Sequence, residues 1–184
     1  AAEGNATAER AWREYHTMIE AARLDVERRH GRGFYVDIHG HGHAIQRLEL
    51  GYLLSASDYD ADDAVLNTVN VINRSSLRAL ATGGLHSHAE LLRGADAIGT
   101  LFELAGYPAV PSMQQPSPGG DPYFTGGYST RRHGSREGGT TDGVQIEANM
   151  QGVRDTEQNR AAFAATLVEV LRSWLATQYG FSID

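Results

Sequence analysis

Residues 34–43 have the sequence Phe34-Tyr35-Val36-Asp37-Ile38-His39-Gly40-His41-Gly42-His43. A short apolar and β-branched run of this kind predicts a buried strand that delivers its last side chains to the edge of a sheet. The carboxyl end of a strand is where α/β proteins usually place their chemistry. Neutral imidazole is a common zinc ligand, and a nearby carboxylate can orient the ring through its second nitrogen. The stretch therefore indicates a metal-dependent hydrolytic site.

The three histidines of this stretch are spaced two residues apart. On a strand they would share one face, whereas on a loop the intervening glycines let them turn in any direction. His39 is the candidate metal ligand, because it directly follows the predicted strand. The roles of His41 and His43 stay open. Asp37 is expected on the opposite face of a regular strand, either as a hydrogen-bonded structural acid or as part of the site.

Helical and strand-like patterns alternate along the rest of the chain. Apolar residues recur at steps of three and four near the N-terminus, which predicts an amphipathic helix, and alternate with other residues in the second predicted strand. Strands separated by helices favour an α/β fold of three layers, with helices on both faces of a mixed, largely parallel sheet. Helices are expected at 8–26, 60–73, 89–105 (broken near 94) and 156–178, and strands at 34–38, 48–54, 107–110 and 143–148.

The composition excludes several classes of function. A chain of 184 residues is long enough for one domain with a sizeable core. Its net charge of −7 argues against a nucleic-acid-binding protein. The absence of cysteine excludes thiolate metal sites and a cysteine nucleophile. No apolar run is long enough to span a bilayer and no signal-like segment is visible, so we expect a soluble protein without a membrane partner, cytoplasmic or periplasmic.

Two motifs in the second half of the chain carry further candidate residues. Gly126-Gly127-Tyr128-Ser129-Thr130-Arg131-Arg132-His133-Gly134 lies within residues 111–139, a Gly/Pro/Ser-rich stretch whose length is typical of functional or disordered loops. Its glycines allow close backbone approach to a ligand, and arginine suits bidentate carboxylate recognition, although a surface loop with solvated arginines is the simpler alternative. In Gly143-Val144-Gln145-Ile146-Glu147, the residues Gln145 and Glu147 share one strand face. Glutamate at a strand end is the group type that deprotonates metal-bound water, although edge strands also commonly expose it.

A second His-x-His pair, His86 and His88, occurs in Gly84-Leu85-His86-Ser87-His88. A polar entry to a helix, with Ser87 near the cap, explains this pair better than a metal site.

Taken in order, three of these motifs resemble the N-formylglutamate amidohydrolase family, which is related to the zinc carboxypeptidases and aspartoacylases. The motifs are Val-Asp-Ile-His-Gly at 36–40, Gly-Gly-Tyr-Ser-Thr-Arg-Arg-His-Gly at 126–134 and Gln-Ile-Glu at 145–147. The resemblance runs from about Trp12 to Tyr179 and implies a zinc-carboxypeptidase-like α/β/α fold with one catalytic zinc ion. By this resemblance, His39 would be the zinc-ligating histidine that comes later in the family's sequence, and Glu147 would be the general base. Arg131 and Tyr128 would be the arginine and the tyrosine of the family's Gly-Gly-Tyr loop.

The chain departs from this family at its N-terminus. The family places its other two metal ligands, a histidine and a nearby acid, in a segment before the first helix. The chain begins at Ala1 without such a segment, and His16 lies in the middle of the predicted helix. We therefore expect residues 1–184 to form the C-terminal two-thirds of a larger catalytic domain. A missing N-terminal segment or a second chain would carry the other ligands, unless His41 and His43 complete a different site.

The predicted function is a Zn²⁺-dependent hydrolase that cleaves the amide of a small N-acyl (N-formyl) amino acid or short peptide-like substrate. Glu147 would take the proton of metal-activated water, and Arg131 would hold a substrate carboxylate or the oxyanion. The substrate-binding residues would be Tyr128, Arg131, Arg132 and Gln145. One alternative is a fragment of a TIM-barrel amidohydrolase, although such barrels have about 250 residues. The other is a non-catalytic binding domain that has lost its metal.

Overall fold

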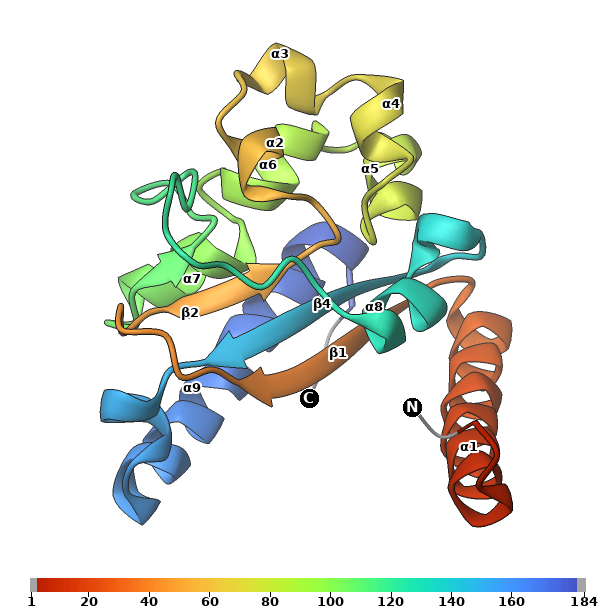
Figure 1. The fold of residues 1–184 in the computed structure, drawn as a ribbon. Helices are drawn as coiled ribbons and strands as arrows, with labels where there is room; N and C mark the ends of the chain where they lie inside the picture. Colours follow the sequence, from red (N-terminus) through yellow and green to blue (C-terminus); the bar gives the residue numbers. More distant parts are fainter. Residues whose placement is uncertain (1–2, 182–184) are drawn as a thin grey trace.

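A four-stranded mixed sheet forms the centre of the protein in the computed structural model, which describes residues 3–181 (Figure 1). The strand order is β1-β4-β2-β3, with β1 parallel to β4, β2 parallel to β3, and β2 antiparallel to β4. The predicted α/β class and mixed sheet are confirmed. The strands are β1 (Gly33–Gly40), β2 (Leu48–Gly51), β3 (Ala109–Val110) and β4 (Thr141–Ala148).

Strand register divides the side chains of the sheet into two faces. In β1, β2 and β4, odd-numbered residues lie beside odd-numbered residues of the neighbouring strand. Because successive side chains of a strand point to opposite faces, all odd-numbered residues of these strands share one face. The even-numbered face is mainly apolar, and the odd-numbered face carries the polar groups described below.

The apolar face packs against two helices, α7 (Ile98–Leu104) and α9 (Glu157–Tyr179). Phe34 of β1 contacts Trp174 of α9 with ring centroids 4.3 Å apart, and Phe102 of α7 stacks on Phe163 at 5.8 Å. One side of α9 is buried in the core or packed against it, and its residues are Phe163, Leu167, Val170, Leu171, Trp174 and Leu175.

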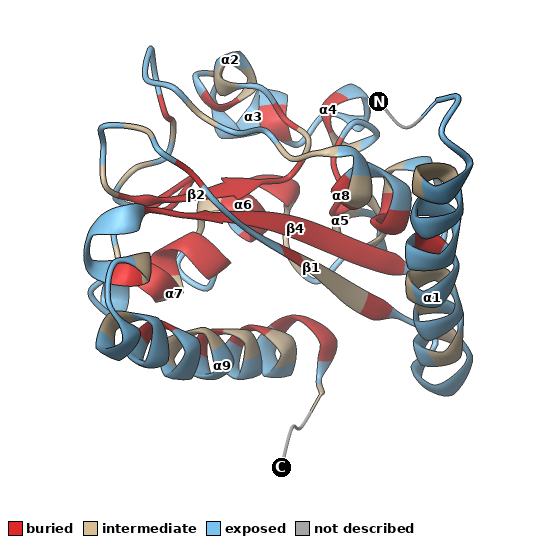
Figure 2. Cartoon of the chain, turned by 60° about the horizontal axis from the view of Figure 1, so that its bottom comes forward, coloured by how far each residue is buried: buried red, intermediate tan, exposed pale blue. Residues whose placement is uncertain are grey.

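Shorter helices lie beyond the sheet on the other side. Figure 2 shows α2, α3, α4 and α8 on the opposite side of the sheet from α7 and α9. The single helix predicted for 60–73 is wrong, because two separate turns form there. Asp62 caps the first of them by accepting a hydrogen bond from Val65 N, and Thr68 begins the second. The bounds are α2 Ala56–Tyr59, α3 Asp63–Leu66, α4 Val69–Ile72, α5 Arg78–Gly83, α6 His88–Arg93 and α8 Tyr128–His133.

The N-terminal helix α1 (Ala6–His30) lies at one end of the sheet and is largely exposed (Figure 1). The apolar stripe predicted to face the core is only partly covered, since Trp12 and Tyr15 remain 43% and 47% exposed. His16 is the only residue of α1 that is fully buried. Among residues 3–181, no helix combines the length and apolarity that crossing a bilayer requires.

Two buried histidines join α1 to α8. His16 Nδ1 lies 2.9 Å from His133 Nε2, and the two rings stack at 5.1 Å. Burial lowers the pKa of both imidazoles, and nearby Arg132 lowers both further. His16 also lowers the pKa of His133, whereas Glu20 opposes the shift. Folding therefore disfavours the charged form of both rings.

This contact predicts a loss of stability in acid. A histidine whose pKa is depressed by folding stabilises the protein above its unfolded pKa, which is about 6.5, and this stabilisation is lost as the pH falls. We expect the free energy of unfolding, measured by urea titration, to fall between pH 7.5 and pH 5. The double variant His16→Gln/His133→Gln should show a smaller decrease over the same range. An equal decrease in both proteins would show that other groups cause the pH dependence.

Candidate metal and catalytic site

Three functional groups form a row across the polar face of the sheet. His39 of β1 is the register partner of Glu147 of β4, and Glu147 is the register partner of Glu49 of β2. The carboxyl ends of the parallel strands β1 and β4 meet at one edge, where α/β proteins usually bind ligands. The two residues that the sequence singled out as metal ligand and general base are therefore neighbours.

Glu147 is buried and held in place by a chain of hydrogen bonds. Its Oε1 accepts a hydrogen bond of 2.7 Å from Gln145 Nε2, and Gln145 Oε1 accepts one of 2.7 Å from Gly127 N. Gln145 and Glu147 share one face, as predicted from their spacing. Gln145 thus links Glu147, the candidate base, to Gly127 of the 126–134 motif. Both its amide oxygen and its amide nitrogen take part in these hydrogen bonds.

His39 is oriented by Asp37 on the same strand face. Its Nε2 lies 3.0 Å from Asp37 Oδ1, and its side chain is 51% exposed whereas Asp37 is buried. The expectation that Asp37 lies on the opposite face is wrong, because residues two positions apart on a strand point the same way. When Nε2 carries the ring proton, Nδ1 is left with a free lone pair. A carboxylate paired with one ring nitrogen is the usual support for a histidine that ligates metal through the other.

Part of the long loop lies directly on the polar face. Phe124 N donates a 2.9 Å hydrogen bond to Glu49 Oε2, and Leu53 N donates to Thr125 O. Gly51 permits this contact, because a Cβ atom there would lie 2.4 Å from Gly126 N. Residues 124–126 of the loop therefore lie against the polar face.

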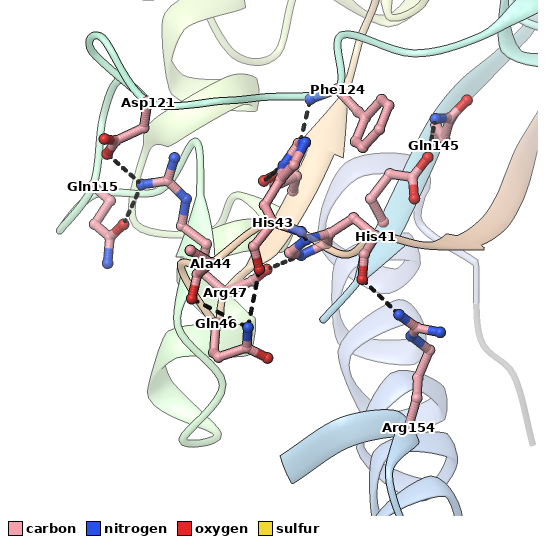
Figure 3. A network of polar contacts seen from close by, with 12 residues as sticks. His41, His43, Ala44, Gln46, Arg47, Gln115, Asp121, Phe124, Gln145 and Arg154 are labelled. Carbon is pink, nitrogen blue, oxygen red and sulfur yellow. Dashed lines mark hydrogen bonds and ion pairs between the residues drawn. The ribbon is translucent and has the colours of Figure 1, made fainter. Parts of the chain in front are cut away.

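Glu49 of this row also belongs to a cluster with His41 and His43. Figure 3 shows the two histidines. Each of the three residues offers one ligand atom, and these atoms lie within 4.8 Å of one another. His43 Nδ1 is 2.8 Å from Glu49 Oε1, and the His43 ring stacks on Phe124 with centroids 4.7 Å apart. Two histidines and a glutamate are a known ligand set for zinc.

The hydrogen bonds of His41 give this cluster a structural explanation as well. His41 Nε2 donates to Arg47 O at 2.8 Å, which leaves Nδ1 to accept from His43 N at 3.1 Å. Both ring nitrogens are therefore used by the backbone, and a metal at Nδ1 would have to replace the second bond. His43 differs, because Glu49 occupies only its Nδ1. The sequence did not single out Glu49, although its alternation with Leu48 and Leu50 placed it on the polar face.

The carboxylates of the polar face have few cationic partners. Asp37 and Glu49 each pair with a histidine, and no arginine of residues 3–181 lies within salt-bridge distance of Asp37, Glu49 or Glu147. The chain contains no lysine. Neighbouring buried carboxylates repel each other unless a cation or a proton compensates their charge. This face therefore suits a cation chemically.

The arginines of the predicted substrate-binding loop point elsewhere. Arg131 Nε donates to Glu137 Oε1 at 2.8 Å, and both side chains are more than half exposed. Arg132 bonds the hydroxyl of Tyr128 and lies 5.3 Å from the centre of the Trp12 ring of α1. No contact within the described residues joins these side chains to His39 or Glu147. Their predicted roles in substrate binding stay predictions.

The second His-x-His pair has the structural role expected of it. Ser87 caps α6 in a capping box with Glu90. His88 is buried, and its Nδ1 bonds Leu66 O at 2.9 Å.

Comparisons with protein-family models, with curated proteins and with solved structures find no match to this chain.

Proposed function

We propose that this chain provides the general base and one metal ligand of a metal-dependent amidohydrolase. The substrate is a small N-acyl amino acid or a short peptide-like molecule that carries a carboxylate. The observation that carries the proposal is the pairing of His39 with Glu147 on adjacent parallel strands. The motif resemblance supports the same two roles and a zinc-carboxypeptidase-like fold.

The residues of the polar face fit a metal in two respects. His39 has a free Nδ1 and a carboxylate behind its other nitrogen. The neighbouring carboxylates would also be compensated by a cation. A zinc ion at this position would polarise the amide carbonyl and lower the pKa of the attacking water.

Glu147 would act on the proton of that water. Its Oε1 is held by Gln145, which leaves Oε2 to accept the proton and then deliver it to the leaving amine. A base that is already fixed in position loses little entropy when the reaction occurs. Gln145 would thus be a positioning residue: it is hydrogen-bonded to Gly127 and fixes the orientation of the Glu147 carboxylate.

His39 alone does not complete a hydrolytic zinc site, which has about three protein ligands plus water. The proposal therefore includes further ligands from a segment outside residues 1–184 or from a second chain. The outer edge of β1 has no partner strand among the described residues, so an additional strand can pair there beside His39.

The TIM-barrel alternative is less consistent with this architecture. Its strands would be parallel and closed into a barrel. Here the described strands form an open sheet with an antiparallel pair at its centre.

Metal removal tests the proposal. We expect the chain, joined to a segment that supplies the further metal ligands, to hydrolyse N-formyl and N-acetyl amino acids when loaded with zinc. Treatment with a chelator should abolish turnover, and added Zn²⁺ should restore it, as followed by release of the free amine. Turnover that persists after complete metal removal would contradict the proposal. So would a zinc-loaded extended chain that hydrolyses none of these amides.

A further inference from the structure

Arg47 is a buried arginine whose charge is poorly compensated. Its side chain is 6% exposed, and the residue directly precedes β2, two positions before Glu49. Among residues 3–181 its side-chain partners are Gln115 Oε1 at 3.4 Å and Asp121 Oδ2 at 3.5 Å, both bonded through Nη1. These are long contacts, and Asp121 is itself about half exposed. Burying a guanidinium with such weak pairing is unfavourable.

The unpaired donors of Arg47 are the two that form one edge of the guanidinium. Both Nε and Nη2 are buried and have no hydrogen-bond partner in the part of the chain that the structure describes. The N–H bonds of these two atoms run nearly parallel, which matches the two oxygens of a carboxylate. Figure 3 shows Nη1 directed at Gln115 and Asp121, and in that view the other edge faces the side on which His43 lies.

The neighbouring acid does not take this position. Glu49 already uses one oxygen for His43 Nδ1 and the other for Phe124 N. Arg131 and Arg132, the arginines expected to bind substrate, are paired with Glu137 and Tyr128. Unlike Arg131 and Arg132, Arg47 retains a pair of donors that no group of residues 3–181 accepts from.

We propose that Arg47 binds the carboxylate of the substrate through Nε and Nη2. The ligand class is a small molecule with a free carboxylate, such as an N-acyl amino acid. The proposal rests on the proposed function only in taking this ligand to be the substrate of the His39–Glu147 site. Because both nitrogens are buried, binding requires the segments around them to open.

Nuclear magnetic resonance of the arginine side chains tests this directly. The unaltered, metal-free chain is titrated with N-acetylglycine, and with N-acetylglycinamide as the uncharged control. We expect the Nε–H resonance of Arg47 to shift with the acid and not with the amide. In Arg47→Lys, which keeps the charge but loses the paired donors, affinity for the acid should fall about tenfold or more. Arg172→Lys, at an exposed position of α9, is the matched control and should bind the acid as the unaltered chain does.

The outcomes separate this inference from the proposed function. An unmoved Arg47 resonance, or equal affinity in Arg47→Lys, would show that Arg47 is structural. Loss of binding in Arg131→Lys alone would assign the carboxylate to the loop arginine instead. The titration requires neither metal nor turnover. Carboxylate binding by Arg47 would therefore stay established even if the hydrolase assay failed. Conversely, hydrolysis with an unchanged KM in Arg47→Lys would overturn only the role of Arg47. Circular dichroism checks the fold of each variant, and the titration of the unaltered chain depends on no variant.

Discussion

Glu147→Gln is expected to lower the turnover of an N-acyl amino acid by a factor of about 10² or more. The substitution keeps the shape of the side chain and an oxygen that can accept from Gln145 Nε2. It removes the carboxylate that takes a proton from water. Zinc affinity should change little, because His39 and not Glu147 is the proposed ligand. The measurement is kcat with the zinc-loaded extended chain, together with the zinc content of each protein.

A matched control separates the loss of the base from a general effect of losing charge. Glu169→Gln makes the same chemical change on an exposed position of α9, where the side chain is 70% exposed. Its turnover should equal that of the unaltered protein. Near-normal turnover in Glu147→Gln would place the base elsewhere. A loss of zinc in that variant would make Glu147 a ligand instead.

The main strands were predictable because their patterns are local. In β1 and β4, apolar residues alternate with polar ones, and both strands formed close to the expected positions. The second strand ended at Gly51, earlier than expected, and Leu53 adopts a positive φ of 67° beyond it. How much of the apolar stripe of α1 is buried by other elements could not be predicted from such a local pattern. Its apolar stripe is only partly covered, since its described contacts are mainly with β1 and α8.

In the candidate site, the sequence could predict only those spatial relationships in which both residues belong to the same short motif. The shared face of Gln145 and Glu147 follows from their spacing alone. The pairing of His39 with Glu147 joins residues 108 positions apart in the chain, and it depends on a strand register that the sequence does not display. The same limit applies to Arg47, because its unpaired donors become visible only when the loop is in place.

His39 is the residue whose loss should remove the metal. Zinc binding by the chain of residues 1–184 alone is expected to be weak, because His39 supplies one ligand. Adding a segment that supplies the further ligands, in the same chain or as a separate one, should raise the affinity by orders of magnitude as those ligands close the site. His39→Ala in the extended chain should then weaken zinc binding beyond the roughly 10- to 100-fold loss typical of an outer partner.

The cluster of His41, His43 and Glu49 gives this prediction a defined rival. If zinc binds there, His43→Ala and Glu49→Gln should abolish binding while His39→Ala leaves it intact, even in the chain of residues 1–184. If zinc binds at His39, the order of effects is reversed, since His41 keeps both ring nitrogens on the backbone and His43 stays paired with Glu49. Equilibrium dialysis followed by elemental analysis measures each variant, with His86→Ala as a histidine control away from the polar face. Tight, stoichiometric zinc in residues 1–184 that survives His39→Ala would move the metal from the end of β1 to the His41–His43–Glu49 cluster. Glu147 would then lose its proposed role as the base beside the metal ligand of β1.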